Sequence, residues 1–130
     1  RPPRSTLFPY TTLFRSLLNG GHLGGTRIIG RKTLELMHSN HLPKKLLPWE
    51  LLGQDNHGLG FGLGSRVMMD VAASAEAGSV GEYGWAGAAK TYYWVDPAEE
   101  LVGLFMSQYM TGVTLPDQAM RALTYQAIDD

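Results

Sequence analysis

Gly81–Gly87 is the stretch of this chain whose residue types and spacing could support chemistry. It reads Gly-Glu-Tyr-Gly-Trp-Ala-Gly and continues through Ala88 towards Lys90. Small side chains on a strand let a ligand approach the backbone closely. Acyl-transfer chemistry needs backbone N–H groups directed at the oxyanion that develops during the reaction. The stretch therefore predicts a strand along which an acyl compound can lie. The alternative from composition alone is a Gly/Ala strand packed tightly under a helix.

Alternating apolar residues predict the strands that would position this stretch. We expect a strand over Gly58–Val71, a loop over Ala72–Ser79 and a second strand over Glu82–Val95. A turn at Asp96–Glu100, with Pro97 fixing one φ angle, should lead into Leu101–Tyr109. That last segment is apolar on both faces, which is typical of a central strand covered on both sides.

Helical patterns flank these strands on both sides. The pattern predicts the last turn of a helix at Leu17–Gly21, a short β segment at Thr26–Ile29, a helix over Arg31–His41 that Pro43 ends, and an irregular connection over Lys44–Asn56. Near the C-terminus, Thr114 and Asp117 resemble a capping box that opens a helix. The apolar stripe expected to dock that helix on the sheet consists of Met120, Leu123, Ala127 and Ile128.

Composition limits the classes of protein to which the chain can belong. Of its 130 residues, 44% are hydrophobic and 18% charged, which fits a folded protein rather than a disordered one. A net charge of −1 gives no basic footprint for nucleic acid or for an anionic membrane, and no apolar run is long enough to span a bilayer. The chain has no cysteine, so disulfides and thiolate metal sites are excluded, whereas the compartment stays open.

The first residues look foreign to the rest of the sequence. Arg1–Ser16 reads RPPRSTLFPYTTLFRS, and one reading frame of a sequencing-library adapter encodes every residue of that segment. We therefore expect 1–16 to be a non-native, adapter-derived segment and exclude it from the fold prediction. The alternative is a genuine Pro- and Thr-rich loop. If the segment is foreign, the natural sequence starts at Leu17 inside a gene, and the true N-terminus is missing.

The pattern from Gly58 to Gln108 resembles the C-terminal active-site strand of the serine β-lactamase and penicillin-binding-protein-like hydrolases, especially their class C-related, family VIII esterase-like branch. In that family a three-residue motif on this strand takes the form Lys-Thr-Gly, His-x-Gly or Trp-x-Gly. Trp85, Ala86 and Gly87 stand at that position, and the resemblance implies that the backbone N–H of Ala88 supplies one oxyanion donor. Trp85 replaces the cationic residue of true β-lactamases, which favours an ester or amide substrate. Lys90 stands where many relatives carry glycine, and we interpret it as a solvated residue.

The other motifs of the family are absent from these 130 residues. No serine is followed three residues later by lysine, so the Ser-x-x-Lys nucleophile is missing. Neither Tyr-x-Asn nor Ser-x-Asn occurs. Because these motifs should precede Leu17, we expect the chain to be a C-terminal fragment that is inactive alone. Residues 17–42 would end a helical region, and residues 58–130 would supply the last sheet strands and the closing helix.

Two other patterns suggest chemistry only weakly. His38 and His41 are spaced like a metal-binding pair on a helix, but they lack a third ligand at motif spacing, and His22 and His57 lie elsewhere. We therefore interpret all four as ordinary polar or capping histidines and predict no metal and no cofactor. The glycines at positions 58, 60, 62 and 64 do not have the spacing of a nucleotide-binding loop.

The sequence thus predicts an α+β chain with a partial β-lactamase/transpeptidase-like fold, in which helices flank an antiparallel sheet. The expected function is that of a serine hydrolase fragment acting on a small ester or amide through an acyl-enzyme. One alternative is a non-catalytic penicillin-binding-protein-like relative that binds a peptide or cell-wall fragment. Another is an unrelated β-rich domain that is complete in itself.

Overall fold

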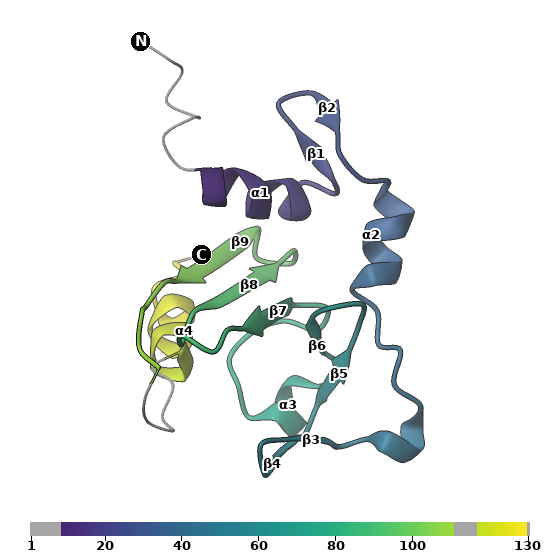
Figure 1. The fold of residues 1–130 in the computed structure, drawn as a ribbon, viewed down its shortest axis with the longest axis vertical. Helices are drawn as coiled ribbons and strands as arrows, with labels where there is room; N and C mark the ends of the chain where they lie inside the picture. Colours follow the sequence, from purple (N-terminus) through teal and green to yellow (C-terminus); the bar gives the residue numbers. More distant parts are fainter. Residues whose placement is uncertain (1–8, 111–116, 130) are drawn as a thin grey trace.

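The computed structural model describes residues 9–110 and 117–129 and has a mixed α+β fold (Figure 1). Its elements, in chain order, are α1 (Pro9–Leu18), β1 (His22–Leu23), β2 (Thr26–Arg27), α2 (Arg31–Met37), the 3-10 turn η2 (Lys44–Leu46), β3 (Trp49–Leu51), β4 (Gln54–Asn56), β5 (Leu59–Phe61), β6 (Arg66–Met68), α3 (Val71–Ser74), β7 (Tyr83–Ala86), β8 (Tyr92–Asp96), β9 (Leu101–Phe105) and α4 (Asp117–Gln126). No helix in these two ranges is long and apolar enough to cross a membrane.

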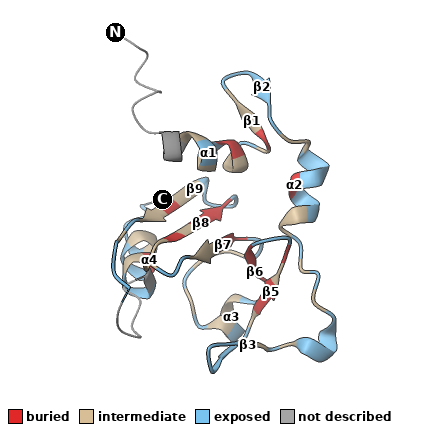
Figure 2. Ribbon diagram, viewed as in Figure 1, coloured by how far each residue is buried: buried red, intermediate tan, exposed pale blue. Residues whose placement is uncertain are grey.

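The main sheet has five antiparallel strands in the order β5-β6-β7-β8-β9. β7 is its middle strand, and Tyr83 pairs with Val67 of β6 on one side and with Val95 of β8 on the other. Buried residues concentrate in these strands (Figure 2), where Trp94 and Val95 have no exposed surface at all. Two small hairpins, β1-β2 and β3-β4, lie outside this sheet.

Helices α1 and α4 cover opposite faces of the sheet. Leu17 and Leu18 of α1 pack against the buried cluster that contains Val95. The hydroxyl of Tyr125 in α4 instead lies 2.8 Å from a carboxylate oxygen of Asp96, the next residue of β8. Because successive side chains of a strand point to opposite faces, the two helices must lie on opposite sides. The sheet is therefore the middle of three layers.

Residues 9–16 take part in this fold, contrary to the expectation that segment 1–16 could be left out of it. They form most of α1, and Phe14 packs on Tyr93 with ring centroids 4.8 Å apart. The predicted last helical turn at Leu17–Gly21 is the end of α1, which stops at Leu18. The adapter-like origin of the segment stays a prediction, but its sequence is compatible with a helix that covers β8 and β9.

Two of the predicted strands are hairpins. Gly58–Val71 contains β5 and β6, because the chain reverses at Gly62–Ser65, where the Gly62 N–H bonds the Ser65 carbonyl at 2.8 Å. Glu82–Val95 contains β7 and β8, joined by a short turn after Gly87. The prediction of a central strand over Leu101–Tyr109 is wrong. The strand found there, β9, stops at Phe105 and lies at the edge of the described sheet.

Other expectations differ from the structure at the ends of elements. α2 ends at Met37, so His41 lies beyond the helix, and the predicted irregular connection contains the β3-β4 hairpin. The predicted loop at Ala72–Ser79 begins with the short helix α3. The predicted β segment near Thr26 is confirmed as β2, and a turn does connect β8 to β9 after Asp96. The predicted capping hydroxyl of Thr114 lies outside the described residues.

The predicted docking stripe of α4 is wrong. Leu123 is 66% exposed and Ile128 is 39% exposed, whereas Arg121 is 2% exposed. α4 therefore docks through a polar contact, because the carboxylate of Glu82 is buried in the sheet and needs a cation beside it.

Candidate functional site

The stretch Trp85-Ala86-Gly87 lies where β7 ends and a turn begins. In β7, Trp85 pairs with Tyr93 and Ala86 pairs with Tyr92 of β8. β6 pairs with β7 only at Tyr83 and Gly84. Within the described part of the chain, the second half of β7 therefore has a strand partner on one side only. An open strand edge of this kind is one along which an extended ligand can bind through backbone hydrogen bonds.

The turn after β7 leaves two successive N–H groups without a hydrogen-bond partner in the part of the chain that the structure describes. The Gly87 N–H bonds the Thr91 carbonyl at 2.8 Å, and the Lys90 N–H bonds the Gly87 carbonyl at 3.0 Å. These two bonds close a three-residue loop, and Lys90 adopts the left-handed conformation with φ of 59°, as expected for the last residue of such a loop. Ala88 and Ala89 have no partner for their N–H groups among the described residues. Successive free amides in a turn can bind an anion.

Aromatic side chains surround Trp85. Its ring lies 4.8 Å from that of Phe61 in an edge-to-face arrangement and 6.2 Å from that of Trp49. Trp49 is itself fixed by a 3.0 Å hydrogen bond from its indole N–H to the Leu59 carbonyl. A cavity of about 260 Å³ opens beside the same strand, and its lining comprises Phe14, Trp85, Ala86, Gly87, Thr91, Tyr92, Tyr93 and Met106. The surroundings of Trp85 are therefore suited to an apolar group.

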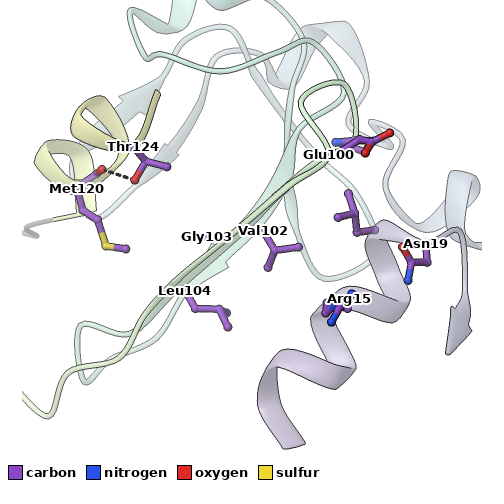
Figure 3. A pocket seen from close by; sticks show the side chains of 10 residues that line it. Arg15, Asn19, Glu100, Val102, Gly103, Leu104, Met120 and Thr124 are labelled. Carbon is purple, nitrogen blue, oxygen red and sulfur yellow. Dashed lines mark hydrogen bonds between the residues drawn. The ribbon is translucent and has the colours of Figure 1, made fainter. Parts of the chain in front are cut away.

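A larger cavity of about 870 Å³ lies elsewhere, around the free edge of β9 (Figure 3). Arg15 of α1 and Asn19, which directly follows α1, line it on one side of the strand, and Met120 and Thr124 of α4 line it on the other. None of the residues singled out on β7 contributes to this cavity. Its size therefore does not identify it as the reaction site.

A serine and a histidine form a pair that the sequence did not predict. The Ser65 Oγ lies 2.8 Å from Nδ1 of His38, whose ring stacks on Tyr83 with centroids 3.5 Å apart. Burial lowers the pKa of His38 to about 4, so its ring is neutral at pH 7. This is the geometry of a nucleophile and its base. However, Ser65 has no exposed surface, and neither residue lines either of the two cavities described above. The pair therefore joins α2 to the sheet and offers no access to a substrate.

His38 and His41, interpreted from the sequence as ordinary polar or capping histidines, each have another partner in the structure. His38 is engaged with Ser65, whereas Nε2 of His41 lies 2.8 Å from the Leu36 carbonyl. Among residues 9–110 and 117–129, no group of three His, Asp or Glu side chains could hold a metal ion. His57 is exposed, and His22 lies in β1.

A buried group of charges lies under the start of β7. Glu82 has no exposed surface, and its carboxylate accepts hydrogen bonds from Arg66 at 3.2 Å and from Tyr125 at 2.8 Å in addition to those from Arg121. Glu76 lies 3.6 Å from Arg66 and 3.5 Å from Arg121. Burial and the bond to Glu82 raise the pKa of Tyr125 well above its ordinary value, so its hydroxyl stays a donor. This group fixes the residue that directly precedes β7.

Sequence reasoning found the β7 motif but missed the residues that hold it in place. Ser107 contacts the turn that follows β7, and Glu82 anchors the start of β7. Neither residue belongs to a recognisable motif. A carboxylate placed directly before a Gly-rich strand was the one available signal for Glu82. Nothing in the sequence pattern points to Ser107.

Comparisons with known proteins place this geometry in context. No protein-family model matches the chain. Protein Rv1367c of Mycobacterium tuberculosis (strain ATCC 25618 / H37Rv) is 31% identical over 109 residues, which are 81% of this chain and 27% of that protein. The chain thus spans about a quarter of the length of the curated relatives it matches.

Solved structures match the fold at lower identity. EstCE1, a hydrolase with promiscuous acyltransferase activity, is 22% identical with a TM-score of 0.68, over 87% of this chain and 28% of that one. A penicillin-binding protein homologue from Caulobacter crescentus is 18% identical with a TM-score of 0.56, over 75% of this chain and 24% of that one. These matches, together with the antiparallel sheet between helices, assign the α+β chain to the β-lactamase/transpeptidase-like fold, of which it contains a part.

Proposed function

We propose that the chain is the C-terminal part of a serine hydrolase that cleaves small esters or amides through an acyl-enzyme. The observation that carries this proposal is the N–H of Ala88, which has no hydrogen-bond partner among the described residues and belongs to an exposed residue directly after Trp85-Ala86-Gly87. In the family that the sequence resembles, this N–H stabilises the oxyanion of the tetrahedral intermediate. A preorganised backbone donor suits that role because it need not reorient as charge develops.

The surroundings of the strand support an ester or amide substrate. The motif position that carries a cation in true β-lactamases is occupied by Trp85, which packs among other aromatic rings. The apolar cavity beside it could take the acyl or alcohol part of an ester. A β-lactam carboxylate would find no cation at that motif position. The solved hydrolase EstCE1, which shares this fold, also supports acyl chemistry.

In this proposal the nucleophile and its base lie in sequence outside these 130 residues. A serine of a Ser-x-x-Lys motif would attack the substrate carbonyl and expel the alcohol or amine, and water would then release the acid from the acyl-enzyme. The present chain would supply one wall of the cleft and one oxyanion donor. Residues 17–42 would close a helical region, and residues 58–130 would complete the sheet. We propose no metal and no organic cofactor.

The test is to recover and express the whole reading frame and to assay it with a chromogenic ester and a chromogenic β-lactam side by side. We expect turnover of the ester, loss of that turnover when the Ser-x-x-Lys serine becomes alanine, and no turnover by the 130-residue chain alone. Turnover of the β-lactam only would contradict the ester preference. A reading frame without Ser-x-x-Lys would favour the non-catalytic relative that binds a peptide or cell-wall fragment.

A further inference from the structure

The turn that carries Ala88 is held from outside by Ser107, which follows β9. The Ser107 hydroxyl lies 2.8 Å from the Ala89 carbonyl and 2.9 Å from the Lys90 carbonyl, and its single O–H is shared between them. The Tyr109 N–H adds a third bond, of 3.1 Å, to the Ala89 carbonyl. Among the described residues, Ser107 is the only partner of the Lys90 carbonyl.

These bonds reach Ala88 through two rigid peptide groups. The Ala89 carbonyl and the Lys90 N–H belong to one planar peptide unit, so a bond that fixes the first also orients the second. The Lys90 N–H bonds the Gly87 carbonyl at 3.0 Å. That carbonyl shares its own plane with the Ala88 N–H. The orientation of the Ala88 donor therefore depends, through one intervening hydrogen bond, on the Ser107 hydroxyl and the Tyr109 N–H, which together hold the Ala89 carbonyl.

The conformation of Lys90 makes this support necessary. A residue with a Cβ in the left-handed region is strained relative to its ordinary conformations. Without an external partner, the turn can relieve the strain by rotating the peptide unit between Ala89 and Lys90. This rotation would break the hydrogen bond from the Lys90 N–H and so also release the Gly87 carbonyl. The hydroxyl of Ser107 opposes that rotation at both flanking carbonyls.

We infer that Ser107 is a positioning residue that aims the Ala88 N–H at the oxyanion of the substrate. The inference rests on the proposed function for the identity of the ligand, a tetrahedral oxyanion. The mechanical link between Ser107 and the turn is independent of the proposed function. The two parts can therefore be tested separately in one set of samples.

The experiment uses NMR on the 130-residue chain and on three variants. Ser107→Ala removes the hydroxyl, and Ser107→Thr keeps it. Ser39→Ala is the matched control, because Ser39 is exposed and donates to the Glu35 carbonyl far from the turn. Backbone ¹⁵N relaxation and the three-bond HN–Hα coupling of Lys90 report the order of the turn. Titration with the monoanion of butyl methylphosphonate, followed at the Ala88 amide, reports oxyanion binding.

We expect Ser107→Ala to lower the order of the Ala88–Lys90 amides and to weaken phosphonate binding roughly five- to tenfold, the loss of about one hydrogen bond. Ser107→Thr and Ser39→Ala should match the parent chain. If Ser107→Ala does not fold, Ser107→Cys, nearly isosteric but a weak donor, takes its place and should show the same loosening.

The outcomes separate the inference from the proposed function. Unchanged order of the turn in Ser107→Ala would overturn the positioning role, whatever the phosphonate does. A loosened turn in Ser107→Ala, combined with no response of Ala88 to phosphonate in the parent chain, would support the mechanical link and count against the proposed function.

Discussion

The guanidinium of Arg121 holds the buried carboxylate of Glu82 with two hydrogen bonds, 2.5 Å from Nη1 to Oε1 and 3.0 Å from Nη2 to Oε2. The two residues lie 39 positions apart, one in α4 and one directly before β7. Arg121 also donates to the Ala77 carbonyl at 2.6 Å. The contact thus fastens the last described helix to the strand that carries the candidate site.

Substitution of the buried Arg121 should lower the free energy of unfolding more than substitution of an exposed cationic residue. Arg121→Met leaves the Glu82 carboxylate buried with Arg66 as its remaining close cation, so we expect a loss of roughly 3 kcal/mol in the free energy of unfolding. Arg31→Met, which breaks an exposed ion pair with Glu35, should leave the stability almost unchanged. Urea denaturation followed by circular dichroism measures both, and equal losses would refute the importance of the buried pair.

His38 should make stability fall in mildly acidic solution. Its pKa is about 4 in the folded chain, because burial disfavours the charged ring, against an ordinary value of 6.5. Between these values the unfolded state binds more protons, so stability is full above pH 6.5 and is lost as the pH falls towards 4. The loss by pH 4 should be roughly 3 kcal/mol.

The measurement compares the parent chain with His38→Phe, which preserves a ring over Tyr83 but cannot titrate. The difference in unfolding free energy between the two should shrink by that amount from pH 7 to pH 4, since carboxylates common to both cancel. In the parent chain, NMR should show the His38 ring titrating near pH 4. A midpoint near 6.5 would mean that the ring is not buried.

Local patterns in the sequence predicted the kind of fold but not the length of its strands. The alternation across Glu82–Val95 looks continuous because the turn between β7 and β8 contains Ala88, Ala89 and Lys90, without the usual Gly, Asn or Pro signals. Paired residues such as Trp85 and Tyr93 lie on the same face and are separated by an even number of positions, so the alternation continues across the turn with the same period. A hairpin was therefore read as one strand.

The candidate site, too, could be predicted only in part from the sequence. The motif from Trp85 to Gly87 could be found from the sequence, because its residues are adjacent. The supports could not be found, because Ser107 acts 17 and 18 residues away and Arg121 acts 39 residues away. The apolar stripe predicted for α4 failed for the same reason, since a helix face is chosen by what lies opposite it, here a buried carboxylate.

Two glycines of the β7 region should differ in their tolerance of a methyl group. A Cβ on Gly84 would lie 2.2 Å from the Tyr93 carbonyl oxygen and 2.9 Å from the Trp94 Cα, both in the paired strand. A Cβ on Gly87 would lie 2.3 Å from the Thr91 hydroxyl, which can rotate away, and its nearest backbone atom would be the Thr91 carbonyl oxygen at an ordinary 3.9 Å. We expect Gly84→Ala to cost about 3 kcal/mol and Gly87→Ala less than about 1.5 kcal/mol. Urea denaturation midpoints, compared at an unchanged m-value, test which variant loses more stability. A larger loss in Gly87→Ala than in Gly84→Ala would contradict the pairing of β7 with β8.

Replacement of Lys90 by glycine should stabilise the chain. Lys90 has φ of 59°, a conformation in which its Cβ is crowded, and glycine adopts it without that cost. After allowance for the greater freedom of glycine in the unfolded state, the expected gain is about 0.5–1 kcal/mol. Lys90→Ala is the matched control, because it removes the charge but keeps the Cβ, and it should leave stability within about 0.5 kcal/mol. If alanine stabilised as much as glycine, the effect would come from the charge of Lys90, and the left-handed conformation of the turn would not be its source.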